Sequence, residues 1–117
     1  MGEVKAYQHR EMAAGRWAEM SLAEQMGNIG SEVSRSLKAK KMGNQRRLAG
    51  ATGRALELFD LTIGCLSDPA KLREVCRARE EFCDYFWGDQ YNVQSEKMMK
   101  YYDEFAGLVR KGGDKSC

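Results

Sequence analysis

Residues 21–42 read SLAEQMGNIGSEVSRSLKAKKM, and this stretch decides the fold class. Ser21 and Glu24 match the S-x-x-E capping box, in which each side chain bonds a free backbone amide at the start of a helix. Apolar residues then recur at intervals of three or four, which places them on one helix face: Leu22, Met26, Ile29, Val33 and Leu37. Gly43 is a typical C-terminal stop. The stretch therefore predicts an amphipathic helix over about 21–42.

Three more helices follow from the same periodicity and from their caps, over about 44–66, 69–87 and 95–111. Asn44 suits the N-cap of the first, and Asp68 with Pro69 suits the start of the second. Because short connections make consecutive helices antiparallel neighbours, we expect an all-α fold, an antiparallel up-down-up-down four-helix bundle. We predict an irregular or short-helical N-terminal arm at 1–20 and a disordered tail at 112–117.

The composition bounds the class of protein. The chain has 117 residues, 43% hydrophobic and 31% charged, which suits one small domain with a core. No apolar run approaches the roughly 18 residues of a membrane-spanning helix, and no signal peptide is expected at the N-terminus. The net charge is only +2, from 19 Lys and Arg against 17 Asp and Glu.

The cysteines and the single histidine speak against a metal site. The four cysteines form no C-x-x-C pair, and His9 has no ligand partner at zinc-site spacing. Cys76 and Cys83 lie two helical turns apart, about 10 Å, which is too far for a disulfide. We therefore expect core cysteines and a reducing, cytoplasmic location. Without a phosphate loop, a Ser/His/Asp set or a Glu-x-x-His motif, no enzyme activity, cofactor or metal is expected.

Three segments have distinctive sequences: SLAEQMGNIGSEV at 21–33, ALELFDLTI at 55–63 and RAREEFCDYF at 77–86. Together they resemble a family of small prokaryotic helical proteins of uncharacterised function, over about residues 17–110. The resemblance implies a four-helix bundle and brings no activity, cofactor or site residue. In fold alone, the pattern is also similar to the small helical bundles that accompany nucleotidyltransferases or reverse transcriptases.

Arg79 falls near the centre of the apolar face predicted for residues 69–87. A buried guanidinium requires a carboxylate or carbonyl partner because it has no neutral form. Glu32 is the first candidate partner and Asp60 the second. Two interpretations stay open, a site that binds an anionic ligand and a structural ion pair that fixes the helix register.

Six cations and no acid lie between residues 35 and 47: Arg35, Lys38, Lys40, Lys41, Arg46 and Arg47. They flank the turn between the first two helices. The expected topology brings Trp87 and Tyr91, beside the 88–94 loop, to the same end. Cations with exposed aromatic rings can hold a phosphate backbone and stack bases. Alternatively, these cations only complement the helix dipole, and the net charge of +2 argues against a dedicated nucleic-acid binder.

Gly50, Gly53 and Gly64 lie with Leu61 on the side opposite the predicted core face of 44–66. Glycine inside a helix costs about 1 kcal/mol relative to alanine. The stripe is therefore either a tolerated weakness or a surface that another helix approaches closely. Since two-fold contacts are the commonest oligomer geometry, we expect a homo-oligomer, most simply a dimer, with Leu61 and Arg54 at the contact.

These features lead to two functional hypotheses. The first is a small non-enzymatic cytoplasmic interaction or accessory module, which binds a protein partner or itself. The alternative is a nucleic-acid-binding accessory protein that uses the basic end at residues 35–47.

Overall fold

The computed structural model describes residues 15–88, 90 and 92–110, and all regular structure among them is helical. It has four long helices, α2 (Leu22–Met42), α3 (Gln45–Cys65), α4 (Pro69–Cys83) and α5 (Ser95–Arg110). A π-helical turn, η1 (Asp84–Gly88), continues α4. The prediction of an all-α fold is confirmed. Residues 15–18 of the predicted arm are helical, while the predicted tail and the first fourteen residues of the arm lie outside the described residues.

The helix ends follow the predicted caps. The Ser21 hydroxyl accepts the Glu24 amide at 3.1 Å, and the Glu24 carboxylate accepts the Ser21 amide at 3.0 Å, which completes the capping box. Gly43 has φ 70°, the left-handed conformation that favours glycine, and Asn44 caps α3. Asp68 accepts the Ala70 amide at the start of α4. Only the helix expected over 69–87 differs, because η1 replaces its last turn.

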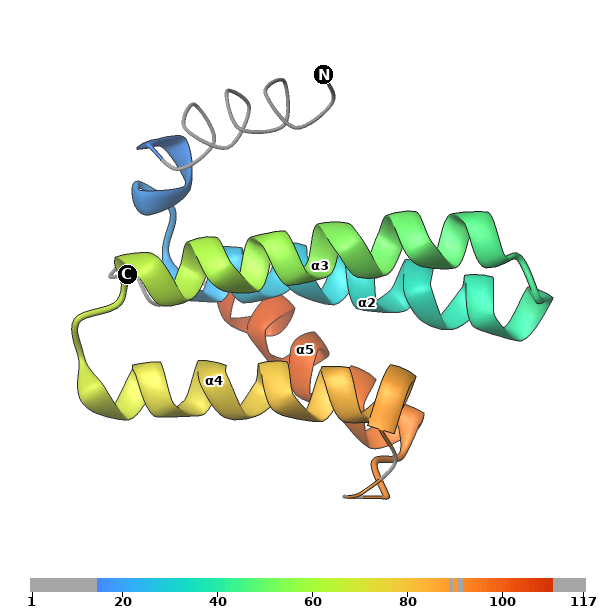
Figure 1. The fold of residues 1–117 in the computed structure, drawn as a ribbon. Helices are drawn as coiled ribbons and strands as arrows, with labels where there is room; N and C mark the ends of the chain where they lie inside the picture. Colours follow the sequence, from blue (N-terminus) through green and yellow to red (C-terminus); the bar gives the residue numbers. More distant parts are fainter. Residues whose placement is uncertain (1–14, 89, 91, 111–117) are drawn as a thin grey trace.

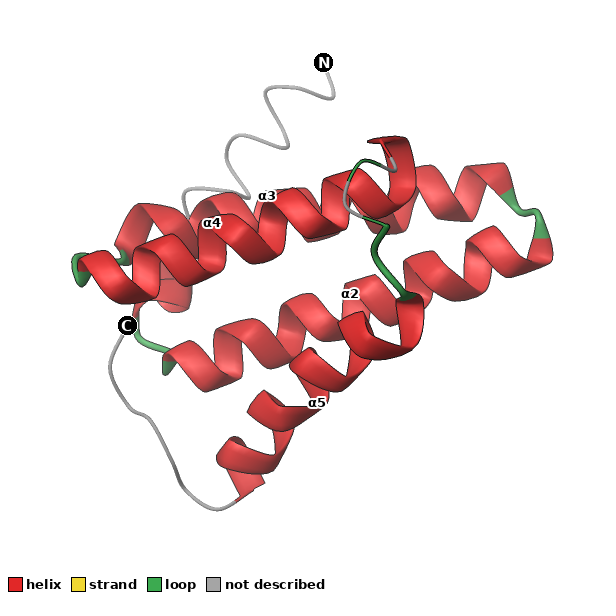
Figure 2. Ribbon diagram, turned by 90° about the horizontal axis from the view of Figure 1, so that it is seen from below, coloured by secondary structure: helices red, strands yellow, loops and turns green. Residues whose placement is uncertain are grey.

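The helices α2 and α3 form a long antiparallel hairpin that extends past the ends of α4 and α5 (Figure 1). Its end, residues 40–50, contains no buried residue, and we call this segment the hairpin tip. The helix α4 runs beside α3, and α5 crosses obliquely on the α2 side (Figure 2). A Cβ atom on Gly30 of α2 would lie 2.7 Å from the Tyr102 Cβ atom of α5, so glycine at this position allows the close crossing.

The core lies away from the hairpin tip, because the buried residues of α2 end at Ala39 and those of α3 begin at Ala51. Its largest fully buried apolar side chains come from three helices: Met26, Ile29, Val33, Phe59, Val75 and Phe82. Trp17, from the predicted arm, packs on this core and donates its indole N–H to the Thr62 hydroxyl at 2.9 Å. None of the helices in the described ranges combines the length and the apolar character needed to cross a bilayer.

Candidate nucleic-acid interface

The turn between α2 and α3 determines which cations come together. Because Gly43 and Asn44 reverse the chain within two residues, the last turns of α2 lie beside the first turns of α3. Residues three or four apart share one helix face. The basic residues of α2 at positions 35 and 38 therefore face the same groove as those of α3 at 46, 47 and 54.

This groove encloses about 600 Å³ on the outer side of the hairpin. Its walls are basic side chains, and its floor is made of small residues. The lining residues are Arg35, Lys38, Ala39, Met42, Arg46, Arg47, Gly50, Ala51 and Arg54. We call it the basic groove. Met42 is the most exposed large apolar side chain in the described part of the chain, at 71%, and it contributes apolar surface to the groove.

Glu32 holds two of the arginines at the wall of the groove. Its carboxylate accepts Arg35 Nη1 at 3.0 Å through one oxygen and Arg54 Nε at 3.2 Å through the other. The Glu32 side chain is only 12% exposed, whereas those of Arg35 and Arg54 are 62% and 58% exposed. A guanidinium has five N–H donors, so most donors of both arginines are left for a ligand.

Charge is strongly segregated along the chain. Seven Lys and Arg residues and no Asp or Glu lie between Val33 and Leu56, whereas the other residues carry 12 Lys and Arg against 17 Asp and Glu. The net charge of +2 averages over this difference, so it is not an argument against a basic binding surface. The sequence interpretation also missed Arg54 as a member of the groove, although it lies two helical turns after Arg46 and Arg47.

Two aromatic residues that the sequence interpretation did not name lie beside the basic end. The Lys40 ammonium lies 4.3 Å from the ring centre of Tyr85 and 5.7 Å from that of Phe86. Trp87 is 59% exposed and packs against Phe82 and Phe86. Tyr91 lies outside the described residues. The loop end of α4 thus meets the basic end through Tyr85 and Phe86.

Tyr85 and Phe86 belong to the π-helical turn, and Asp84 bonds this turn to the following segment. Asp84 is buried, and its carboxylate accepts the Gln90 amide at 2.6 Å. A Cβ atom on Gly88 would lie 2.7 Å from the Asp84 carboxylate oxygen. The extra residue in this turn rotates the following side chains relative to an α-helix.

The expected burial of Arg79 is wrong. The buried residues of α4 are Val75, Ala78 and Phe82, so Arg79 lies at the edge of the apolar face, with 35% of its side chain exposed. It pairs with Asp60 on α3, at 3.1 Å between Nε and Oδ1, and not with Glu32, which binds Arg35 and Arg54 instead. An exposed pair of this kind contributes little to stability.

The cysteine beside Arg79 is not an activated nucleophile. Cys76 and Cys83 are free thiols. Burial raises the pKa of the Cys83 thiol, and Arg79 offsets only part of this effect, so the reactive thiolate form is disfavoured. Across the described ranges, no three His, Cys, Asp or Glu side chains come together as metal ligands.

The predicted oligomer surface overlaps the basic groove. Gly50 and Arg54 line the groove itself. Gly53 and Gly64 are exposed, with no atom within 4 Å of an added Cβ, and Leu61 is half-buried. The two surfaces that the sequence suggested separately are thus parts of one outer face of the hairpin.

Comparison with protein-family models, with curated proteins and with solved structures gives no match for this chain.

Proposed function

We propose that this protein is a small accessory module that acts by binding rather than by catalysis, and that its main ligand is the phosphate backbone of a nucleic acid. The observation that carries the proposal is the basic groove, where five cations from two helices face one space of about 600 Å³. Contacts of Lys and Arg with phosphates supply most of the sequence-independent affinity for nucleic acids. This end is left uncovered because the hairpin of α2 and α3 extends past α4 and α5 (Figure 1).

The shape of the groove suits a backbone ligand. Ala39, Gly50 and Ala51 form a low floor, which allows a sugar-phosphate chain to approach the helices closely. Arg35 and Arg54 are already oriented by Glu32. Because oriented side chains lose less conformational entropy on binding, more of the contact energy remains as affinity.

The charge segregation supports the same ligand. A surface with seven cations and no acid over residues 33–56 attracts a polyanion over the distance set by the salt concentration. The proposed contacts are with the phosphate backbone, which is the same for every base sequence, so we expect binding with little sequence preference.

Fluorescence anisotropy with short RNA and DNA, single-stranded and duplex, tests the proposal over a salt series from about 50 to 200 mM. We expect binding at low salt that weakens steeply as salt is added, because each phosphate contact releases counterions. The comparison of the four probes identifies the form of nucleic acid. If none of them binds at the lowest salt, the proposal is wrong.

A charge-matched pair of variants locates the binding surface. Arg46→Gln with Arg47→Gln removes two exposed cations that line the groove. We expect at least about tenfold weaker binding and a salt slope reduced by about one for each phosphate that is no longer neutralised. The control, Arg73→Gln with Arg77→Gln, removes two exposed cations from α4. Equal weakening by the control would show that net charge, and not the groove, drives binding.

Self-association is the second proposed function, and the open space around Gly53 and Gly64 favours it. A two-fold dimer centred on Leu61 would cover this part of the outer face. Because Leu61 lies about 22 Å along α3 from Arg46, at 1.5 Å per residue, an antiparallel dimer keeps the two basic grooves far apart. Their mutual repulsion is then largely screened at physiological salt.

Light scattering at tens of micromolar protein decides whether this dimer forms. We expect a dimeric mass for the wild type and a monomeric mass for Leu61→Glu, because the change buries a carboxylate in the contact. A monomeric wild type contradicts the dimer. A dimer that survives Leu61→Glu contradicts this interface.

A further inference from the structure

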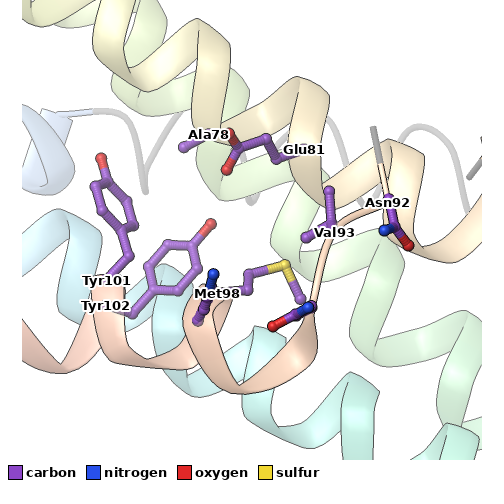
Figure 3. Close-up of a pocket in the computed structure, with 9 residues that line it drawn as sticks. Ala78, Glu81, Asn92, Val93, Met98, Tyr101 and Tyr102 are labelled. Atoms are coloured by element: carbon purple, nitrogen blue, oxygen red, sulfur yellow. The ribbon is translucent and has the colours of Figure 1, made fainter. Parts of the chain in front are cut away.

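A second hollow lies between α4, the segment 92–94 and α5, and it shares no lining residue with the basic groove (Figure 3). It encloses about 480 Å³. That volume lies within the range of small-molecule sites, roughly 300–1,000 Å³. Glu81 of α4 and Lys97, Met98, Tyr101 and Tyr102 of α5 are among the residues that line it.

Tyr102 presents an unsatisfied hydroxyl to this hollow. The residue is only 2% exposed, and its hydroxyl makes no hydrogen bond with any described residue. No fully enclosed side-chain oxygen or nitrogen in the described part of the chain lacks a partner, so this hydroxyl is not fully enclosed and reaches open space. In Figure 3, the Tyr102 ring stands on α5 with its hydroxyl directed toward Glu81.

Glu81 adds a carboxylate that is also unpaired, since it has no ion pair or hydrogen bond within the described ranges. Tyr101 differs, because its hydroxyl donates to the Glu74 carboxylate at 3.1 Å. Burial raises the pKa of Tyr102, and the Glu81 carboxylate raises it further. Burial and then Glu74 have the same effect on the pKa of Tyr101. Both phenols therefore stay protonated, and the charged lining residues are the Glu81 carboxylate and the exposed Lys97.

We propose that this hollow binds the ammonium group of a small organic amine. Glu81 is the counter-ion, and the Tyr102 hydroxyl accepts a hydrogen bond from the ammonium. The Met98 side chain and the Tyr101 ring line the space for the alkyl chain. Aromatic rings beside a carboxylate are a favourable setting for such a cation. The proposal does not depend on nucleic-acid binding, because no residue is common to the two sites.

Three unbranched four-carbon probes separate the role of the head group: butylammonium, butan-1-ol and butyrate. Each is titrated at constant ionic strength up to about 50 mM, because a ligand with so few atoms binds weakly, and the protein amide signals are followed by NMR. We expect butylammonium to shift the signals around Glu81 and Tyr102 and to bind at least about tenfold more tightly than butanol. Equal binding of butanol, or preferred binding of butyrate through Lys97, would overturn the proposal.

Matched variants test the two polar groups. Glu81→Gln keeps the shape of the side chain and removes its charge, and we expect about tenfold weaker binding of butylammonium. Tyr102→Phe removes only the hydroxyl, and we expect binding to weaken a few-fold. Glu80→Gln is the control, because this neighbouring carboxylate is exposed and does not line the hollow. If Glu80→Gln weakens binding as much as Glu81→Gln, the proposal fails. If a variant does not fold, the three probes on the wild type still decide.

Discussion

The two halves of the hairpin of α2 and α3 differ in burial and in charge. In the closed half, residues 22–36 and 52–65, polar groups are buried and bonded. Gln25 is fully buried there and donates to the Trp17 carbonyl at 2.7 Å, while Thr62 accepts the Trp17 indole N–H. In the hairpin tip, residues 40–50, no side chain is buried, and four cations are exposed.

This difference separates stability from binding. A buried polar group costs little when each of its hydrogen bonds is made, so the closed half can fix the position of Trp17 without reducing stability. Like charges with no acid among them repel one another and favour no packed state. The tip therefore contributes little to folding, and its cations can be used by a ligand.

The substitution with the largest expected effect on stability removes an aromatic ring from the closed half. Phe59 is 0% exposed, with its ring centre 5.8 Å from that of Phe82. We expect Phe59→Ala to lower the free energy of unfolding by about 3–5 kcal/mol, because the neighbours cannot fill the cavity. Chemical denaturation followed by circular dichroism measures the change.

Leu48→Ala is the matched substitution at the tip, where Leu48 is half-buried. We expect the free energy of unfolding to fall by about 1 kcal/mol or less. Equal decreases from the two substitutions would mean that the tip also forms part of the stabilising core. This result would contradict the conclusion that the tip contributes little to folding.

The helix ends could be predicted because their causes are local. Ser21 with Glu24, Asn44, and Asp68 with Pro69 each bond or shape the backbone within three residues, so neighbours in sequence suffice to place them. The basic cluster was likewise visible, because its members adjoin one turn. The sequence alone could not show that Arg54 belongs to that cluster, because this depends on the register between two helices.

The burial expected for Arg79 was wrong for a related reason. Which side of α4 faces the core depends on how α4 packs against α3, and this packing selects Val75, Ala78 and Phe82 instead of the face with Arg79. The amine site combines α4, α5 and the segment between them, so no single periodicity could reveal the meeting of Glu81 and Tyr102.

Two glycine substitutions give a further test, and they should differ in sign. Gly30 lies in the closed half, where an added Cβ would come within 2.7 Å of the Tyr102 Cβ atom. We expect Gly30→Ala to destabilise by about 1–3 kcal/mol, because α5 must move away from α2. Gly53 lies on the open outer face with no atom within 4 Å of an added Cβ. We expect Gly53→Ala to stabilise by up to about 1 kcal/mol through helix propensity alone.

Thermal melts of both variants at a low and a high protein concentration measure these changes and separate folding from association. At low concentration, the opposite signs should be visible in the melting temperature. At high concentration, a dimer that packs closely on Gly53 would oppose the stabilisation, because the new methyl group enters the contact. If Gly53→Ala stabilises equally at both concentrations, the face around Gly53 does not pack closely in a dimer. If Gly30→Ala also stabilises, the Tyr102 Cβ atom does not lie within 2.7 Å of a Cβ atom at position 30, and α5 crosses α2 less closely than described.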